Sequence, residues 1–460
     1  MQVRVISSSP LREALVPRII RRAVELSRGP STRVMKIPWE AIQNEALDTL
    51  RALVRLDTSN PPGNERIAAD LIAGSLGVHG IDSVIRESAP NRANLVARLA
   101  GADRARPALL LSSHTDVVPV ERSGWTRDPF GAEAHQGCIW GRGTIDMKSK
   151  GAMDLVLVSA LKRAGAIPNC DIILAAVADE EAGSDLGAKF LVERHPELVR
   201  AGWVLNEVGG FTLHVGRRRL YPIQVAEKGF VTLKMTVTAP PGHGSMPRRD
   251  TAIAKISALI TKLVNTPMRR SITPLMKRTL ADLGLPEDDP GPLLRPMLSN
   301  TVSPTILRAG YKDNVIPGEA SVVLDGRTVP GEDPESFMAE LRTIVGPEPK
   351  FELIKTAPPA ETSPDTELFE LIRRHVEAAD PGARAIPWMT PGATDNKFYA
   401  RLGSQCYGFS PVKLHSHMPF GSLFHGNDER LPIDGFFWGL KVYAEVVLEF
   451  VGLKFSDIFS

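Results

Sequence analysis

Cysteine is scarce in this chain of 460 residues, which has only Cys138, Cys170 and Cys406. Because the three are widely spaced and odd in number, they argue against a disulfide framework and favour a reducing compartment such as the cytoplasm. An excess of one charge is also lacking, since 55 basic residues face 53 acidic ones and the formal net charge is +2. That balance gives no reason to expect nucleic acid or an anionic membrane as a partner.

A long apolar run is missing from the N-terminal segment. Residues 1–34 are rich in arginine and poor in acid, but their apolar residues are too few for a secretory signal or a membrane span. Such a leader can be a transit peptide. We favour the simpler interpretation that Met35 is the true start and that residues 1–36 are a leader, either disordered or upstream of that start.

The chain is too long for one ordinary core, so two domains are expected. Apolar runs that predict buried strands alternate with helical segments, which indicates right-handed crossovers and a largely parallel sheet. These strands are expected at 108–111, 172–177 and 203–205. We therefore predict an α/β domain from 37–223 and 358–460, with a mostly parallel twisted sheet and helices on both faces.

Residues 224–357 have a different pattern. The stretch 230–238 alternates between apolar and polar residues, as a half-solvated antiparallel strand does. The following elements complete the order βαββαβ, which is typical of a ferredoxin-like unit. We expect 224–357 to be an inserted ferredoxin-like α+β domain, with the Pro-rich excursion 265–300 as a helical elaboration of unassigned role.

Chemically capable side chains follow the predicted strands of the first domain. His114 and Asp116 come after 108–111, and an imidazole and a carboxylate two residues apart on a strand point to the same side. Glu180 and Glu181 follow the next predicted strand, and Glu207 follows the third. Because ligands bind beyond the carboxyl ends of parallel strands, we expect these side chains to converge.

Two further residues join this set. Asp146 lies in a turn that leads into a predicted helix, and His425 lies near the last helix of the chain. So many buried carboxylates would repel one another, and cations resolve that repulsion. Two histidines with three carboxylates, one of them bridging, suit a pair of zinc ions about 3.5 to 4 Å apart, with one carboxylate left to act on the bound water.

Each residue also has a simpler interpretation. His114 alone could be a hydrogen-bonded core histidine, and Glu180 with Glu181 could be a solvated turn. Asp146 could cap the following helix, and His425 could be an ordinary loop histidine. The joint occurrence of these residues at strand ends favours the metal site.

The motifs resemble those of a known family of co-catalytic zinc enzymes, which includes aminoacylase, carboxypeptidase G, acetylornithine deacetylase and succinyl-diaminopimelate desuccinylase. Coverage runs from about residue 42 to the C-terminus, and the aminoacylase-like branch is the most similar. The matching segments are 114–116, 143–148, 179–183, Glu207, 242–247, 314–317, 393–398, 408–411 and 425–431.

The resemblance implies that Asp146 bridges two divalent metal ions. His114 and Glu207 would complete one metal site, and Glu181 and His425 would complete the other. Zinc is the expected metal, although a mixed oxygen-rich site also accepts cobalt or manganese.

The resemblance also implies catalytic roles. Asp116 would accept a hydrogen bond from the other ring nitrogen of His114, and Glu180 would be the general base. In the inserted domain, which would be a lid and the contact of a homodimer, His243 would reach across the dimer interface and polarise the scissile carbonyl. Arg327, with Asn314 beside it, would bind the free carboxylate of the substrate.

The inserted residues have alternatives too. The glycine-flanked His243 could lie in an ordinary turn, and Arg327 could be a surface ion-pair partner.

For the whole chain we predict a zinc-dependent hydrolase that cleaves the amide bond of an N-acyl amino acid or small peptide with a free carboxylate. The alternatives are a dipeptidase, a desuccinylase or deacetylase of the same family, or an inactive binding relative.

Overall fold

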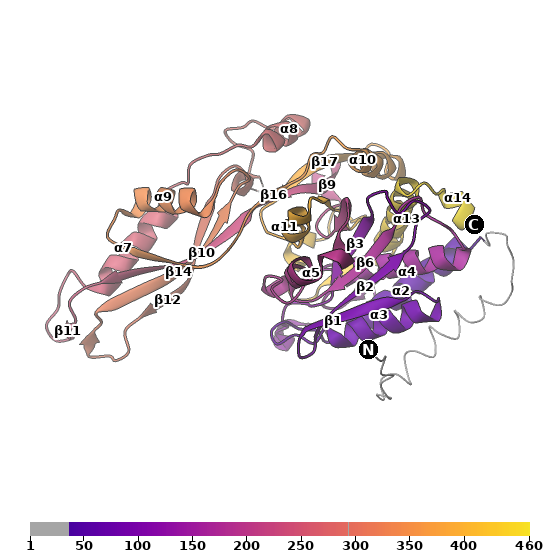
Figure 1. Cartoon of the computed structure of the whole chain (residues 1–460). Coiled ribbons are helices and arrows are strands. Elements are labelled where there is room, and N and C mark those ends of the chain that lie inside the picture. The colour runs from indigo at the N-terminus through magenta and orange to yellow at the C-terminus, as the bar shows by residue number, and fades with distance from the viewer. Residues whose placement is uncertain (1–35, 293) are drawn as a thin grey trace. The chain divides into compact units, whose positions relative to one another are not determined.

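The computed structural model describes residues 36–292 and 294–460. The expectations for residues 1–35 lie outside this part. The chain divides into two compact units (Figure 1). The first contains the residues up to Ile223, Ser363–Ala385 and Phe398–Ser460, and the second contains Gln224–Thr362 and Ile386–Lys397.

The first unit is built on a sheet with the order β1-β2-β6-β3-β7-β18. These strands are β1 (Ser83–Ala89), β2 (Arg92–Leu99), β6 (Ile172–Val177), β3 (Leu109–His114), β7 (Trp203–Asn206) and β18 (Gln405–Gly408). The last four are parallel neighbours, whereas β1 and β2 pair antiparallel at one edge. The expected α/β class with a parallel central sheet is confirmed.

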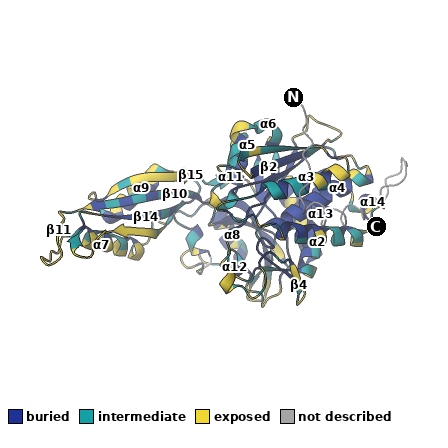
Figure 2. Ribbon diagram, turned by 90° about the horizontal axis from the view of Figure 1, so that it is seen from below, coloured by how far each residue is buried: buried dark blue, intermediate teal, exposed yellow. Residues whose placement is uncertain are grey.

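Helices pack on this sheet, and its central strands are fully buried (Figure 2). The helices of the unit are α2 (Trp39–Val54), α3 (Arg66–Val78), α4 (Lys148–Ala164), α5 (Ala188–Arg194), α6 (Pro196–Val199), α10 (Glu367–Ala379), α12 (Phe420–Leu423), α13 (Ile433–Phe450) and α14 (Phe455–Ile458). Helix α4 ends at Gly165, whose backbone is left-handed at φ 66°, the conformation that glycine adopts most easily. Leu110, Ile173 and Val204 belong to the apolar core around the parallel strands.

A small antiparallel sheet accompanies the main one in the order β19-β5-β4. Its strands are β4 (Glu133–His135), β5 (Cys138–Trp140) and β19 (Arg430–Pro432). The pairing of β19 with β5 brings the segment after His425 beside the segment that leads to Asp146.

The second unit contains a four-stranded antiparallel sheet in the order β12-β14-β10-β15. Along the chain its elements are β10 (Gly229–Thr238), α7 (Ala252–Asn265), β12 (Thr301–Ala309), β14 (Glu319–Thr328), α9 (Pro334–Val345) and β15 (Lys350–Ala357). This is the expected βαββαβ order. Alternate residues of β10 are buried, so the period-two pattern of 230–238 marks the covered face of the sheet.

The remaining elements are divided between the two units. They are β8 (Leu213–Val215), β9 (Arg218–Glu227), β11 (Gly242–His243), α8 (Pro274–Leu283), β13 (Val315–Ile316), β16 (Ala360–Glu361), β17 (Arg384–Thr390) and α11 (Asn396–Tyr399). Helix α8 lies in the 265–300 excursion, as the helical elaboration expected there. In the described part of the chain, the helices are too short or too polar to cross a bilayer.

Candidate metal centre and active site

Strand ends bring the first imidazole and carboxylate together. His114 is the last residue of β3, and Glu207 follows β7, the parallel neighbour of β3. His114 Nε2 lies 3.5 Å from Glu207 Oε2 and 3.0 Å from Asp146 Oδ1. Asp146 reaches this point from the turn before α4. His114, Asp146 and Glu207 form what we call the first ligand group.

A second group uses the other oxygen of the same carboxylate. His425 Nε2 lies 3.3 Å from Asp146 Oδ2 and 3.0 Å from Glu181 Oε2. We call Asp146, Glu181 and His425 the second ligand group. Asp146 thus faces both groups, one with each carboxylate oxygen, which is the arrangement of a bridging ligand.

The two groups have the dimensions of metal sites. Within each group one ligand atom per residue lies within 4.8 Å of the others. Bonds of about 2.1 Å to a tetrahedral ion separate the ligand atoms by about 3.4 Å, close to the observed contacts. The donors are imidazole nitrogens and carboxylate oxygens, which divalent ions such as zinc accept. The residues therefore fit a pair of divalent ions.

The titration behaviour of the histidines reflects the negative charge of the cavity. Burial by itself would lower the pKa of His114, but the charge of Glu207 and hydrogen bonds to Asp116 and Asp146 outweigh it, and the pKa lies well above its usual range. Hydrogen bonds to Asp146 and Glu181 raise the pKa of His425 to about 10. Burial, and then the charge of Asp146, raise the pKa of Glu181. A cavity that attracts protons so strongly suits a divalent cation.

Asp116 orients several parts of the site. Nδ1 of His114 lies 3.0 Å from the backbone carbonyl of Asp116 and 3.5 Å from its carboxylate. The same carboxylate accepts the backbone N–H groups of Glu180 at 3.2 Å and Glu181 at 3.1 Å. Asp116 therefore fixes the His114 ring, as metal-bound histidines require, and also the turn that presents the two glutamates.

A buried hydrogen-bonded network stabilises the turn that carries Glu180 and Glu181. Arg92 donates to both oxygens of Glu65 at 2.7 Å and to Asp179 at 2.7 Å, and Asn60 donates to Asp116 at 2.8 Å and Asp179 at 3.1 Å. Asp179, the residue before Glu180, has a left-handed backbone with φ 67°. The motifs did not indicate Asn60, Arg92 or Glu65, because their contribution depends on contacts between distant segments.

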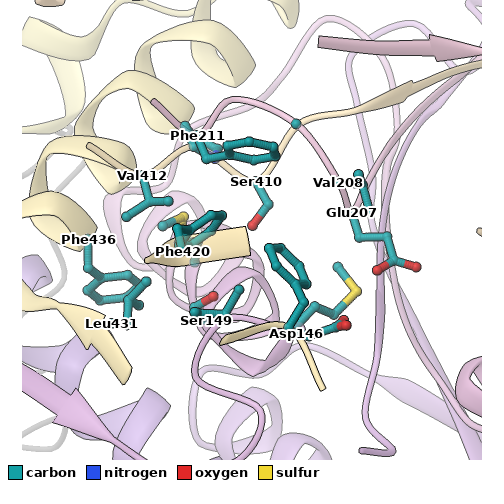
Figure 3. Close-up of a pocket in the computed structure, with 16 residues that line it drawn as sticks. Asp146, Ser149, Glu207, Val208, Phe211, Ser410, Val412, Phe420, Leu431 and Phe436 are labelled. Carbon is teal, nitrogen blue, oxygen red and sulfur yellow. The ribbon is translucent and has the colours of Figure 1, made fainter. Parts of the chain in front are cut away.

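An apolar pocket adjoins the ligands. Figure 3 shows Asp146 and Glu207 at its wall beside aromatic and aliphatic side chains. The labelled apolar members are Val208, Phe211, Val412, Phe420, Leu431 and Phe436. Its volume of about 20 Å³ has room for about one water. Such a wall lowers the local dielectric and strengthens the electrostatic interactions of the ligands.

The structure separates the residues expected in the inserted domain. His243 in β11 is exposed, its Nδ1 lies 2.7 Å from Ser245 Oγ, and Gly244 N donates to Asn314 O at 2.8 Å. Arg327 pairs with Phe230 at the start of β10, while Glu319 pairs with Thr238 at its end, on the side of Asn314. The expectation that Asn314 lies beside Arg327 is therefore wrong, because the length of β14 separates them.

The comparison with known proteins gives the class of the chain. The model of Peptidase family M20/M25/M40 matches residues 110–449, so the chain belongs to this family and is a metallohydrolase that acts on amide bonds. It is 28% identical to aminoacylase-1 of Sus scrofa over 432 residues, which cover 88% of this chain and 95% of that protein. The resemblance inferred from the motifs is confirmed.

Two further relatives are similar. The chain is 28% identical over 383 residues to probable carboxypeptidase S-like 2 of Dictyostelium discoideum, with 75% of this chain and 72% of that protein covered. The structure of the M20 family metallo-carboxypeptidase Sso-CP2 from Sulfolobus solfataricus has a TM-score of 0.69 over 88% of this chain and 98% of that chain. The TM-score shows a shared fold, and at 18% identity the similarity is limited to that fold.

Proposed function

We propose that the chain is a zinc-dependent hydrolase of N-acyl amino acids or small peptides with a free carboxylate, of the aminoacylase or carboxypeptidase type. The observation that carries the proposal is the sharing of Asp146 between the two ligand groups. Glu180 adjoins the ligand Glu181 in the same turn, and Asp116 holds the backbone of both. We assign the Glu180 carboxylate the role of general base beside the metal ions.

The proposed chemistry assigns proton transfer to Glu180. When bound, a pair of divalent ions, zinc or alternatively cobalt or manganese, supplies Lewis acidity toward water and the substrate carbonyl. Glu180 accepts the proton of the attacking water and returns it to the leaving amine nitrogen. His243 donates an N–H hydrogen bond to the carbonyl oxygen as negative charge develops there.

Substrate binding is assigned to Arg327 and Asn314. Arg327 donates to both oxygens of Asp325, at 2.9 and 3.1 Å, and the pair is about one third exposed. A guanidinium has five N–H donors, so this contact orients the side chain and leaves donors for a substrate carboxylate. Asn314 adjoins the His243 turn and is separated from Arg327 by β14. We therefore assign Asn314, with His243, to the active site of the partner subunit in the homodimer proposed below, where its exposed side chain binds the substrate near the carbonyl.

The substrate class is tested by a panel of N-acetyl amino acids, dipeptides and N-succinyl substrates. We expect the N-acyl amino acids to be hydrolysed best. Methyl esters of the same substrates should lose about 10- to 100-fold in kcat/KM, because a charged hydrogen bond contributes about 1.5 to 3 kcal/mol. A preference for dipeptides or for N-succinyl substrates would instead indicate the dipeptidase or desuccinylase alternative, and no turnover at all would indicate an inactive binding relative.

We also propose a homodimer formed through the inserted domain. Strand β12 lies at the edge of the four-stranded sheet, and its Ile306 and Leu307 are 47% and 57% exposed. An exposed apolar edge strand is suited to pairing with a second copy. His243 lies on the exposed β11 turn of the same unit, and in such a dimer it acts on the site of the partner.

Complementation tests this trans arrangement. The variants His243→Ala and Glu180→Gln should each be nearly inactive alone. Random mixing by coexpression should restore about a quarter of wild-type activity, because half of the dimers then hold one intact composite site. Coexpression of Glu180→Gln with a chain that carries both substitutions is the control and should restore none. If His243 acts within its own chain, the first mixture stays inactive as well.

We place the enzyme in the cytoplasm. Its three cysteines are free thiols, with Cys138 half-buried and Cys170 and Cys406 buried. Secreted proteins more often use their cysteines in disulfides.

A further inference from the structure

We propose that Glu429 and Arg142 form a buried clamp that positions Asp146 and His425 together and so sets the affinity for the metal ion of the second ligand group. The proposal rests on the proposed metal-dependent function. Neither residue belongs to a ligand group, and both act through the ligands. They are therefore positioning residues.

The Glu429 carboxylate organises the turn that carries the bridging ligand. One oxygen, Oε1, accepts the backbone N–H groups of Ile145 at 2.7 Å and Asp146 at 3.3 Å. The other, Oε2, accepts the N–H of Gly143 at 3.1 Å and an N–H of Arg142 at 2.7 Å. Backbone N–H groups that converge in this way form a site for an anion, and here the anion is a side chain of the protein itself.

Arg142 extends the clamp to the second histidine. Its guanidinium bonds Glu429 and also donates to the backbone carbonyl of His425 at 3.3 Å, and it lies over the ring of Trp125 at 5.3 Å. Gly141 N donates to Glu429 O at 2.9 Å, so the two segments are joined through their backbones as well. The turn of Asp146 and the turn of His425 therefore form one hydrogen-bonded assembly.

The second ligand group depends on this assembly more than the first. The side chain of His114 is 1% exposed and lies at the end of a central strand, so packing fixes it. The side chain of His425 is 56% exposed, and its backbone is left-handed at φ 57°. Because little packing holds this ring, the hydrogen bonds to its backbone determine where it lies. Loss of the clamp should therefore affect the second metal ion most.

The test is a titration of the metal-free full-length chain with Co²⁺, followed by calorimetry and by the visible absorption of the bound ion. The variant Glu429→Gln keeps the shape of the side chain but turns an amide NH₂ toward backbone N–H groups. We expect its second equivalent of Co²⁺ to bind about 10- to 100-fold more weakly, the usual effect of losing a partner that orients a ligand. The first equivalent should change much less.

Asp154→Asn is the matched control. Asp154 is also a buried carboxylate, and it accepts hydrogen bonds from Lys150 at 2.7 Å and from Tyr443. Among the described residues, neither the turn of Asp146 nor the turn of His425 hydrogen-bonds to it. We expect this variant to unfold at a lower temperature and to bind both equivalents normally. If Glu429→Gln does not fold, Arg142→Lys takes its place, since it removes the planar fork that joins Glu429 to His425 and should weaken the second equivalent in the same direction.

The outcomes separate the clamp from the metal function. Wild-type protein that binds no divalent ion contradicts the proposed function itself. Wild-type protein that binds two ions, with both affinities unchanged in Glu429→Gln or Arg142→Lys, overturns the clamp alone. Equal weakening of both equivalents also overturns it, because the effect would then be a general loss of structure.

Discussion

The variant Glu180→Gln is expected to keep both metal ions and to lose almost all turnover. Glutamine has nearly the same shape, but its amide cannot accept the proton of the attacking water. Loss of a general base lowers kcat by about 10²- to 10⁴-fold. The backbone of the turn should stay in place, because Asp116 accepts the N–H of residue 180 whatever its side chain. The measurements are kcat and KM on an N-acyl amino acid, together with elemental analysis of the purified protein.

Two control variants help to interpret this result. Glu193→Gln changes an exposed glutamate on α5 and should leave kcat unchanged. Glu181→Gln removes a ligand and should lose metal as well as activity. Normal turnover by Glu180→Gln would contradict the assignment of the base, whereas loss of metal from that variant would assign Glu180 to the ligands.

Removal of the metal ions should abolish activity and lower the temperature of unfolding. Without cations the carboxylates of Asp146, Glu181 and Glu207 repel one another in one cavity, and His114 and His425 offset part of their charge. A ligand present at about 1,000 times its Kd stabilises the folded state by about 4 kcal/mol. Chelation removes that contribution, so the loss of stability should depend on metal concentration.

The experiment treats the protein with a chelator, removes the chelator and records activity and thermal unfolding before and after zinc, cobalt or manganese is added back. The variant with both His114→Ala and His425→Ala is the control, since the chelator should barely change its unfolding. Full activity in protein shown by elemental analysis to be free of metal would contradict a metal-dependent mechanism. The ion that restores the highest kcat/KM identifies the preferred metal.

The placement of most ligands follows from local rules. Apolar runs predict β3, β6 and β7, and the ends of parallel strands meet at one edge of a sheet. His114, Glu181 and Glu207 could therefore be grouped from the sequence. His425 lies in a turn far along the chain with no periodic pattern around it. Its residue type made it a candidate, and the family resemblance assigned it to one of the two metal sites.

Other features depend on contacts that no local pattern reveals. Glu429 belongs to a matching motif, yet its bonds reach residues 143–146, more than 280 positions away. Residues 386–397 belong to the second unit, although they follow a segment of the first unit along the chain. The sequence does not reveal this, because strand β17 is as apolar as the strands of the first unit. The separation of Arg327 from Asn314 follows from the length of β14, which extends over Glu319–Thr328, because an extended strand rises about 3.3 Å per residue.

The left-handed backbones of Asp179 and His425 have a consequence for evolution in the laboratory. Side chains other than glycine tolerate that conformation at a cost of about 1 to 3 kcal/mol per position. Glycine would relieve that cost, but Asp179→Gly would leave the buried Arg92 without one of its partners, and His425→Gly would remove a ligand of the stabilising metal ion. A screen for heat resistance should therefore keep both residues, because what their side chains bind outweighs the strain of their backbones.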